Sequence, residues 1–264
     1  MLATFEQAAL EAGKAILDIY RAGCDVTFKE DLSPVTIADE QAERIIIEHL
    51  SRAFPGVPIV AEESVAAGNV PDVRGKSFFL VDPLDGTREF VEKRDEFTVN
   101  IAYIENGVPV AGIVYAPAIG LAFTGEDGKA QKLTVDEAFS VTGRSDIRAR
   151  PEPTDLLALA SRHYNNARTD RFLTDNAITA CTSVGSSLKF CMVAEGRADV
   201  YPRFSRTMEW DTAAGDAVLR AAGGVTVMAN GLPLVYGKTD QSEDSDFANP
   251  DFISWGCGKT RGRA

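Results

Sequence analysis

The chain has 264 residues, of which 45% are hydrophobic and 25% are charged, as in a globular protein with a sizeable core. Its formal net charge of −12 repels polyanions, so binding to DNA or RNA polymers is not expected. Four scattered cysteines without a CxxC pair predict free thiols in a reducing cytoplasm, and two histidines are too few for a histidine-rich metal site. No apolar run approaches the roughly 20 residues that span a bilayer, so no transmembrane segment is expected.

The elements of the first half follow from the spacing of apolar residues. Residues 1–20 repeat such residues every three or four positions, which predicts an amphipathic helix rather than a signal peptide. Thr36 opens a second helix, which ends before Pro55. The remaining segments are predicted strands at 26–29, 58–61, 78–81, 97–104 and 108–117, a further strand with its turn at 121–130, and an exposed loop at 64–77. The turn at Asn106-Gly107 joins two of these strands as a hairpin.

The second half alternates helices with strands. The predicted strands are 156–162 and 198–204, the predicted helices are 168–176, 186–196 and 211–224, and 225–236 is a predicted hairpin. Between the halves, residues 142–155 are charged and contain prolines, so we place a seam near residue 150. The expectation is a layered α/β architecture, a single catalytic unit (1–264) with an N-terminal α+β lobe (1–150) and a C-terminal α/β lobe (151–264).

The stretch FFLVDPLDGTREF, residues 78–90, brings two carboxylates to the end of a buried strand. Pro83 cannot donate to the ladder, so we expect the strand to stop there and to aim Asp82 and Asp85 at one point. Taken alone, the pattern fits equally well two solvated aspartates in a turn, one of them capping a helix that begins near Thr87.

Three other acids, Glu62, Asp211 and Asp39, lie where an apolar segment meets a turn. Ordinary structural roles are available for them: Asp211 fits a helix N-cap, and Thr36-x-x-Asp39 fits a capping box with Asp in place of Glu. If they converge on the first pair, the carboxylates repel one another unless a cation lies among them. Mg²⁺ binds carboxylates, water and phosphate oxygens, and two such ions about 4 Å apart can clamp a phosphoryl group.

A phosphatase with a covalent aspartyl intermediate is the nearest competing site. Haloacid-dehalogenase-type enzymes place two aspartates two apart, whereas Asp82 and Asp85 are three apart with a proline between them. We therefore reject that mechanism and the aspartyl-phosphate intermediate. Gly86 and Thr87, at a predicted helix start, would offer backbone N–H groups to a phosphate oxygen.

VDPLDGTREF, with IVAEES upstream and EWDTAAGDAV downstream, resembles the lithium-sensitive, Mg²⁺-dependent inositol monophosphatase superfamily. The long segment DPLDGTREFVEKRDEFTVNIAYIENGVPVAGIVYAPAIG and the motifs SRHYN, VGSSLKFCMVAEGRADVYPRF and ANPDF are similar to its CysQ-type 3'(2'),5'-bisphosphate nucleotidases. The similarity runs from about SPVT to ANPDF, with the motifs in family order. The resemblance implies an αβαβα sandwich of the inositol monophosphatase and fructose-1,6-bisphosphatase type, and two or three Mg²⁺ ions.

The resemblance also implies which residues carry the chemistry. The implied metal ligands are Glu62, Asp82, the Leu84 carbonyl, Asp85 and Asp211. The nucleophile would be water, activated beside an acid–hydroxyl pair that is Asp39 with Thr87 in the nucleotidase branch. In inositol monophosphatases the acid that matches Glu62 more often takes this role, and we favour Asp39 as the base. A threonine hydroxyl can hold a water while its own hydrogen bonds to a carboxylate.

A second phosphate, remote from the metals, would explain two further cations. Lys189 lies near a helix start and Arg203 offers a planar fork, both suited to phosphate, although without the resemblance ordinary surface cations explain them better. The resemblance makes His163 a candidate base or sugar contact. The full expected substrate-binding set is Gly86, Thr87, His163, Ser186, Lys189, Arg203 and Asp211.

The resulting hypothesis is hydrolysis of the 3'-phosphate of 3'-phosphoadenosine 5'-phosphate to AMP and phosphate, in the clearance of a by-product of sulfate assimilation. The 5'-phosphosulfate analogue is a second expected substrate. An inositol or sugar monophosphatase is the alternative enzyme, and a non-catalytic, metal-dependent nucleotide sensor is the alternative of another class. The expected partner is a small nucleotide, and the sequence leaves open whether the chain forms a homodimer.

Overall fold

The computed structural model describes residues 1–28, 34–160 and 166–256. Its helices are α1 (Leu2–Ala22), α2 (Ile37–Ala53), α3 (Glu62–Ala66), α4 (Thr87–Val91), α5 (Ala167–Asp175), α6 (Leu188–Ala194) and α7 (Glu209–Ala221), with a 3-10 turn, η1, at Pro117–Ile119. Its strands are β1 (Thr27–Phe28), β2 (Pro34–Val35), β3 (Ile59–Ala61), β4 (Phe78–Asp85), β5 (Thr98–Glu105), β6 (Val108–Ala116), β7 (Leu121–Glu126), β8 (Lys129–Val135), β9 (Val141–Ile147), β10 (Leu157–Ala160), β11 (Ala180–Ser183), β12 (Val200–Arg203), β13 (Val225–Met228) and β14 (Phe252–Trp255).

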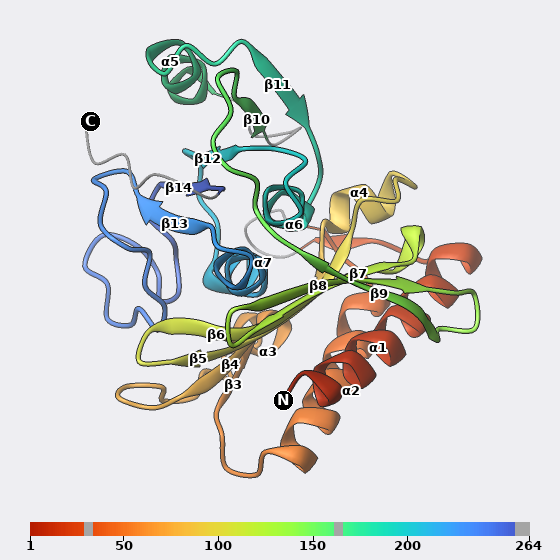
Figure 1. Cartoon of the computed structure of the whole chain (residues 1–264). Helices are drawn as coiled ribbons and strands as arrows, with labels where there is room; N and C mark the ends of the chain where they lie inside the picture. The colour runs from red at the N-terminus through yellow and green to blue at the C-terminus, as the bar shows by residue number, and fades with distance from the viewer. Residues whose placement is uncertain (29–33, 161–165, 257–264) are drawn as a thin grey trace.

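A seven-stranded sheet in the order β3-β4-β5-β6-β7-β8-β9 forms the centre of the first half. The helices α1 and α2 lie side by side on one face, and α7 covers the other (Figure 1). Because side chains alternate along a strand, β4 sends Phe79 and Val81 into the core under α1 and α2, and Phe78 and Leu80 into the core under α7. Burial on both faces is why this strand reads as a continuous apolar run.

A second sheet, ordered β11-β10-β12-β14-β13, lies beyond α6 and α7 (Figure 1). On its inner face, Phe190 of α6 stacks with Phe252 at 5.9 Å between ring centroids. On its outer face, Phe172 of α5 packs near Val200 and Trp255. Helices and sheets therefore alternate in the order αβαβα, which confirms the expected fold class.

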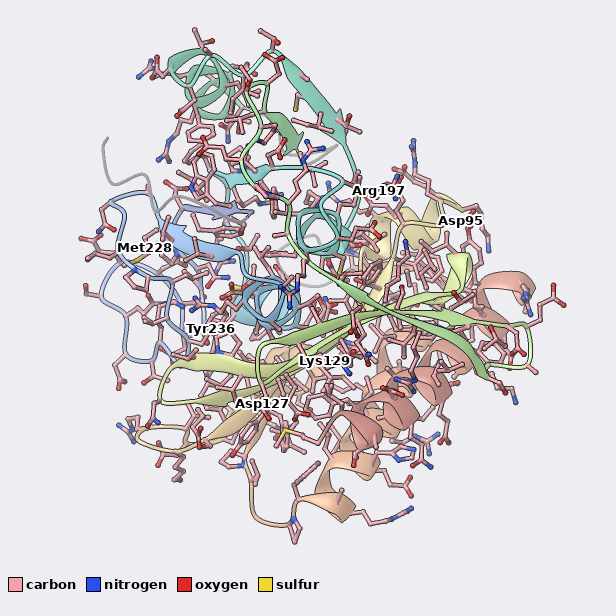
Figure 2. All side chains as sticks on the ribbon, in the orientation of Figure 1. Asp95, Asp127, Lys129, Arg197, Met228 and Tyr236 are labelled. Atoms are coloured by element: carbon pink, nitrogen blue, oxygen red, sulfur yellow. The ribbon has the colours of Figure 1, made fainter. Side chains whose placement is uncertain are left out.

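Two glycines bring α7 unusually close to the large sheet. A Cβ atom added at Gly125 of β7 would lie 2.6 Å from the Val218 Cα and 2.7 Å from the Ala217 carbonyl oxygen, and one at Gly112 of β6 would lie 2.8 Å from the Ala217 Cβ. Side chains fill the layers on both sides of α7, and Tyr236 lies beside it (Figure 2). The Tyr236 hydroxyl donates to Oδ2 of Asp216, a buried residue of α7, over 3.1 Å. The backbone contact fixes the position of α7, and with it the residues at the start of the helix.

Several predicted boundaries are wrong for reasons of long-range pairing. Residues 141–147, which we expected within the connection between the halves, form the edge strand β9 paired with β8. All seven residues of β9 are partly or fully exposed, so the strand lacks an apolar pattern in the sequence. The hairpin predicted at 225–236 is formed only in part. The Met228 N–H donates to the Leu232 carbonyl oxygen over 2.7 Å, but the ladder partner of β13 is β14, which lies more than twenty residues downstream. From the expected second arm, Pro233 makes an isolated bridge to Val227.

Near the acidic motifs, the structure differs from the prediction in two places. The strand β4 continues through Pro83 to Asp85 instead of ending at 81, and the expected loop at 64–77 begins inside α3. The predicted seam near residue 150 falls between β9 and β10, although the division into two lobes remains a prediction. None of the helices in the described residues combines the length and the apolar character needed to cross a membrane.

We predict that Gly125→Ala lowers the free energy of unfolding by about 1–3 kcal/mol, because the added methyl group meets the backbone of α7. Urea unfolding followed by tryptophan fluorescence measures the change. Gly143→Ala in β9 is the matched control, since its added Cβ would have no neighbour closer than 3.6 Å. Equal stability of the two variants would contradict the close packing of α7.

Candidate active site

A cavity of about 440 Å³ opens between the two halves of the chain. It is lined by the end of β4, the start of α3, the turn before α4, residues 185–189 and the first turn of α7. The acids Glu62, Asp82, Asp85 and Asp211, far apart in the sequence, all line it. The structure thus brings together four of the five acids that the sequence singled out. The fifth, Asp39, is not among the residues that line the cavity and is reached through Thr87.

A bulge in β4 explains how two aspartates three positions apart share one side of the sheet. Asp82 pairs with Asn100 of β5 and Asp85 pairs with Thr98, so three steps along β4 match two steps along β5. In a regular strand, residues three apart point to opposite faces, and the extra residue of a bulge corrects this parity. Pro83 lies within the bulge, where its missing N–H breaks no regular ladder bond.

The carboxyl groups lie in an environment that opposes their charge. Burial raises the pKa of Asp82 well above its usual range, and the neighbouring carboxyls add to the shift. Burial also raises the pKa of Asp85 to about 6, although Lys189 lowers it in part. The pKa of Asp211 is raised to about 8, first by burial and then by Asp85 and Glu62. A cation among these groups would relieve the repulsion.

Glu62 is the first residue of α3, and a glutamate that we did not single out holds this short helix in place. The carboxylate of Glu43, buried on α2, accepts hydrogen bonds from the backbone N–H groups of Glu63 (2.7 Å) and Ser64 (2.8 Å), and from the Ser64 hydroxyl (2.6 Å). Its sequence signal is its place on the apolar face of the predicted helix, four residues after Asp39 and beside Ala42. An acid on such a face requires a partner inside the fold.

The predicted acid–hydroxyl pair is in contact. The Thr87 hydroxyl lies 3.2 Å from Asp39 Oδ1 and 3.2 Å from the Leu84 carbonyl oxygen. The other oxygen, Asp39 Oδ2, accepts from the Thr36 N–H and hydroxyl, each over 2.8 Å, in the expected capping box. Burial raises the pKa of Asp39 to about 6. One aspartate therefore caps α2 and touches the turn that carries the aspartate pair.

The segment before α6 supplies another part of the cavity wall. The Ser187 N–H donates to Asp85 Oδ2 over 2.5 Å, which ties the second half of the chain to the end of β4. Lys189 is only 3% exposed, and its ammonium donates to the carbonyl oxygens of Val184 (3.1 Å) and Ser186 (2.5 Å). Burial lowers the pKa of Lys189 to about 8. This lysine is thus not the ordinary surface cation of the alternative interpretation.

Most of the remaining residues that we expected to contact substrate lie at the cavity. Gly86, Thr87, Ser186 and Arg203 all line the cavity. The Arg203 guanidinium donates to the Ser205 carbonyl oxygen over 3.3 Å. His163 lies outside the described residues. The roles of these residues in binding substrate stay predictions.

The donor set suits an open metal site rather than a closed one. Within residues 1–28, 34–160 and 166–256, no three Asp, Glu, His or Cys side chains are grouped so that they could hold a metal ion by themselves. Mg²⁺ does not need such a cage, because it keeps several waters and takes a few carboxylates together with substrate phosphate. The buried, mutually repelling carboxyl groups of Asp82, Asp85 and Asp211 fit this requirement.

Comparison with known proteins places these features in one family. Residues 1–250 match the Inositol monophosphatase family. The chain belongs to this family. The resemblance of the sequence motifs is thereby confirmed, and metal dependence is typical of these phosphatases.

Among the relatives are bisphosphate nucleotidases that align over almost the whole chain. The 3'(2'),5'-bisphosphate nucleotidase CysQ of Escherichia coli (strain K12) is 42% identical over 249 residues, which cover 93% of this chain and 96% of the relative. The CysQ of Salmonella typhimurium is 41% identical, over 96% of this chain and 98% of the relative. The crystal structure of CysQ from Bacteroides thetaiotaomicron superposes with a TM-score of 0.77 at 36% identity, covering 96% of this chain and 95% of that one.

We predict that Glu43→Ala lowers the free energy of unfolding by about 1–3 kcal/mol, because three donors at the start of α3 lose their charged acceptor. The Mg²⁺ concentration that half-saturates the protein should rise as well, since Glu62 loses its support. Urea unfolding and a Mg²⁺ titration of tryptophan fluorescence measure the two effects. Glu40→Ala, exposed on the same helix, is the control, and identical behaviour of both variants would contradict this role.

Proposed function

We propose that this chain hydrolyses the 3'-phosphate of 3'-phosphoadenosine 5'-phosphate to AMP and inorganic phosphate, with the 5'-phosphosulfate analogue as a second substrate. This proposal rests on the 42% identity to a CysQ bisphosphate nucleotidase over 93% of the chain. The cavity supports it, because acidic residues and the cations Lys189 and Arg203 line the same space. A substrate with two phosphates matches this distribution of charge.

The proposed metal site uses oxygen ligands alone. Two or three Mg²⁺ ions would be held by Glu62, Asp82, the Leu84 carbonyl, Asp85 and Asp211. When bound, Mg²⁺ neutralises charge on the transferred phosphate and makes water a stronger nucleophile at neutral pH. Asp82 and Asp85 enter this set through the bulge in β4, which turns both toward one side of the sheet.

The residues of the chain would position and deprotonate the water. The Thr87 hydroxyl can accept a hydrogen bond from water while its own hydrogen points to Asp39 Oδ1, 3.2 Å away. This contact supports Asp39 as the base and Glu62 as a ligand. The capping bonds from Thr36 hold the opposite oxygen of Asp39, so the carboxylate cannot rotate away from Thr87 without losing them.

The second phosphate would lie at the basic side of the cavity. An ammonium has three donors, and two of those on Lys189 are engaged by the carbonyl oxygens of Val184 and Ser186. The third can bond a phosphate oxygen, with Arg203 and Ser186 beside it on the cavity wall. The backbone of Gly86 and Thr87 would contact the transferred phosphate, and Asp211 and His163 would contact the sugar.

A comparison of substrates tests the function. We expect kcat/KM for phosphate release from 3'-phosphoadenosine 5'-phosphate to exceed that for inositol 1-phosphate by about 100-fold, because only the bisphosphate engages the second cationic side. Chelation of Mg²⁺ should abolish release, and Asp85→Asn serves as the inactive control. A preference for inositol 1-phosphate would favour the monophosphatase alternative, and tight binding of the bisphosphate without phosphate release would favour the sensor.

Replacement of the Thr87 hydroxyl tests the acid–hydroxyl pair. Thr87→Val has nearly the same shape but cannot hold the water, so we expect kcat to fall by about 10²- to 10⁴-fold at saturating substrate and Mg²⁺. Thr87→Ser keeps the hydroxyl and should stay within about tenfold of the wild type. A wild-type kcat in Thr87→Val, with an unchanged melting temperature, would exclude the proposed role.

A further inference from the structure

Glu96, which precedes β5, lies between the two turns that shape the cavity. On one side, its carbonyl oxygen would be 3.1 Å from a Cβ atom added at Gly86, in the turn that follows Asp85. On the other side, its carboxylate Oε2 accepts the N–H of Gly185 over 2.7 Å. A Cβ at Gly185 would lie 2.9 Å from both the Cβ and the carbonyl oxygen of Glu96. Both turns therefore reach Glu96 only because each places a glycine against it.

The Gly185 turn carries a direct bond to the acidic cluster. Two residues after Gly185, the Ser187 N–H donates to Asp85 Oδ2 over 2.5 Å, and the Ser187 hydroxyl lies 2.7 Å from Asn100 Oδ1. Between them, Ser186 has a φ of +47°, a conformation that a non-glycine residue adopts only when its surroundings impose it. The turn thus needs anchors at both ends to keep its shape.

The two anchors differ in kind. At the Ser187 end, buried side chains of β5 hold the hydroxyl, with Thr98 Oγ1 at 2.8 Å in addition to Asn100. At the Gly185 end, the backbone N–H donates to the Glu96 carboxylate in a charge-assisted hydrogen bond that crosses from one half of the chain to the other. Glu96 itself is not among the residues that line the cavity, whereas Gly185, Ser186 and Ser187 are.

We propose that Glu96 is a positioning residue: its carboxylate clamps the Gly185 turn so that Ser187 orients Asp85 and Ser186 faces the substrate. It acts through these residues and does not touch substrate. This proposal rests on the proposed function for its kinetic consequence. Its structural consequence, the order of the 184–187 turn, does not depend on what the substrate is.

Three variants separate the hydrogen bond from general stability. Glu96→Ala removes the acceptor, and Glu96→Gln keeps an oxygen that can accept the Gly185 N–H. Glu92→Ala is the matched control, because Glu92 is exposed on the same connection and pairs with Arg94. Each protein is measured as the full chain, with its melting temperature recorded.

The first measurements need no substrate. Amide hydrogen exchange should quicken about tenfold or more in the peptide that spans 184–188 of Glu96→Ala, and stay as in the wild type in Glu92→Ala. The Mg²⁺ concentration for half-saturation, followed by the fluorescence of Trp210 next to Asp211, should rise several-fold in Glu96→Ala. Neither measurement requires hydrolysis of 3'-phosphoadenosine 5'-phosphate. If the proposed function is wrong, the wild type will release no phosphate from this substrate, whatever the exchange and Mg²⁺ results are.

The kinetic measurement distinguishes positioning from stability. In Glu96→Ala, KM for 3'-phosphoadenosine 5'-phosphate should rise about tenfold, with a smaller change in kcat at saturating Mg²⁺. Glu96→Gln should restore both values to within about threefold of the wild type. The proposal is overturned if Glu96→Ala changes only the melting temperature, if exchange quickens with KM unchanged, or if Glu96→Gln is as impaired as Glu96→Ala.

Discussion

The repulsion among carboxyl groups in one cavity is the constraint on which the rest of this structure depends. Five acids from three parts of the chain, Glu62, Asp82, Asp85, Glu89 and Asp211, line the same space. Burial with mutual repulsion raises the pKa values of Asp82, Asp85 and Asp211. Such an arrangement costs stability, so the surrounding fold must impose it. The bulge in β4, the Glu43 cap on α3 and the glycine contacts that place α7 each fix one part of the cluster.

Backbone N–H groups orient the aspartates of the site. In the described part of the chain, a backbone N–H from a nearby turn or helix start orients one oxygen of each: Leu84 for Asp82, Ser187 for Asp85 and Met208 for Asp211. One hydrogen-bonded oxygen sets the direction of the carboxylate and leaves the second oxygen available to bind a metal ion. Rigid backbone donors do this without adding positive side chains, which would compete with Mg²⁺ for the carboxylates.

Local pattern was enough to predict what depends on local chemistry. The helices α1 and α2, the hairpin of β5 and β6, and the capping box of Thr36 with Asp39 follow from spacing, capping and turn residues. The contact of Asp39 with Thr87, 48 positions apart, was implied only by the resemblance to the family. What the sequence did not reveal depends on partners distant along the chain. The bulge is defined by register with β5, β13 finds its partner in β14, and Glu96 acts on a residue 89 positions away. Glu43 is the intermediate case, since an acid on an apolar helix face was visible as an anomaly without its partner.

Under the proposed function, the charge of the protein would make the binding of cation and of substrate interdependent. With a formal net charge of −12 and an acidic cavity, the chain repels a bisphosphate until the local field is changed. Lys189 and Arg203 can reverse the field on one side of the cavity, but the carboxylates on the other side need bound cations to do so. By linkage, if bound Mg²⁺ makes substrate binding more favourable, bound substrate makes Mg²⁺ binding more favourable by the same free energy. Under the proposed function, the carboxylates that repel one another in the cavity would therefore couple metal binding to binding of the phosphate that is cleaved.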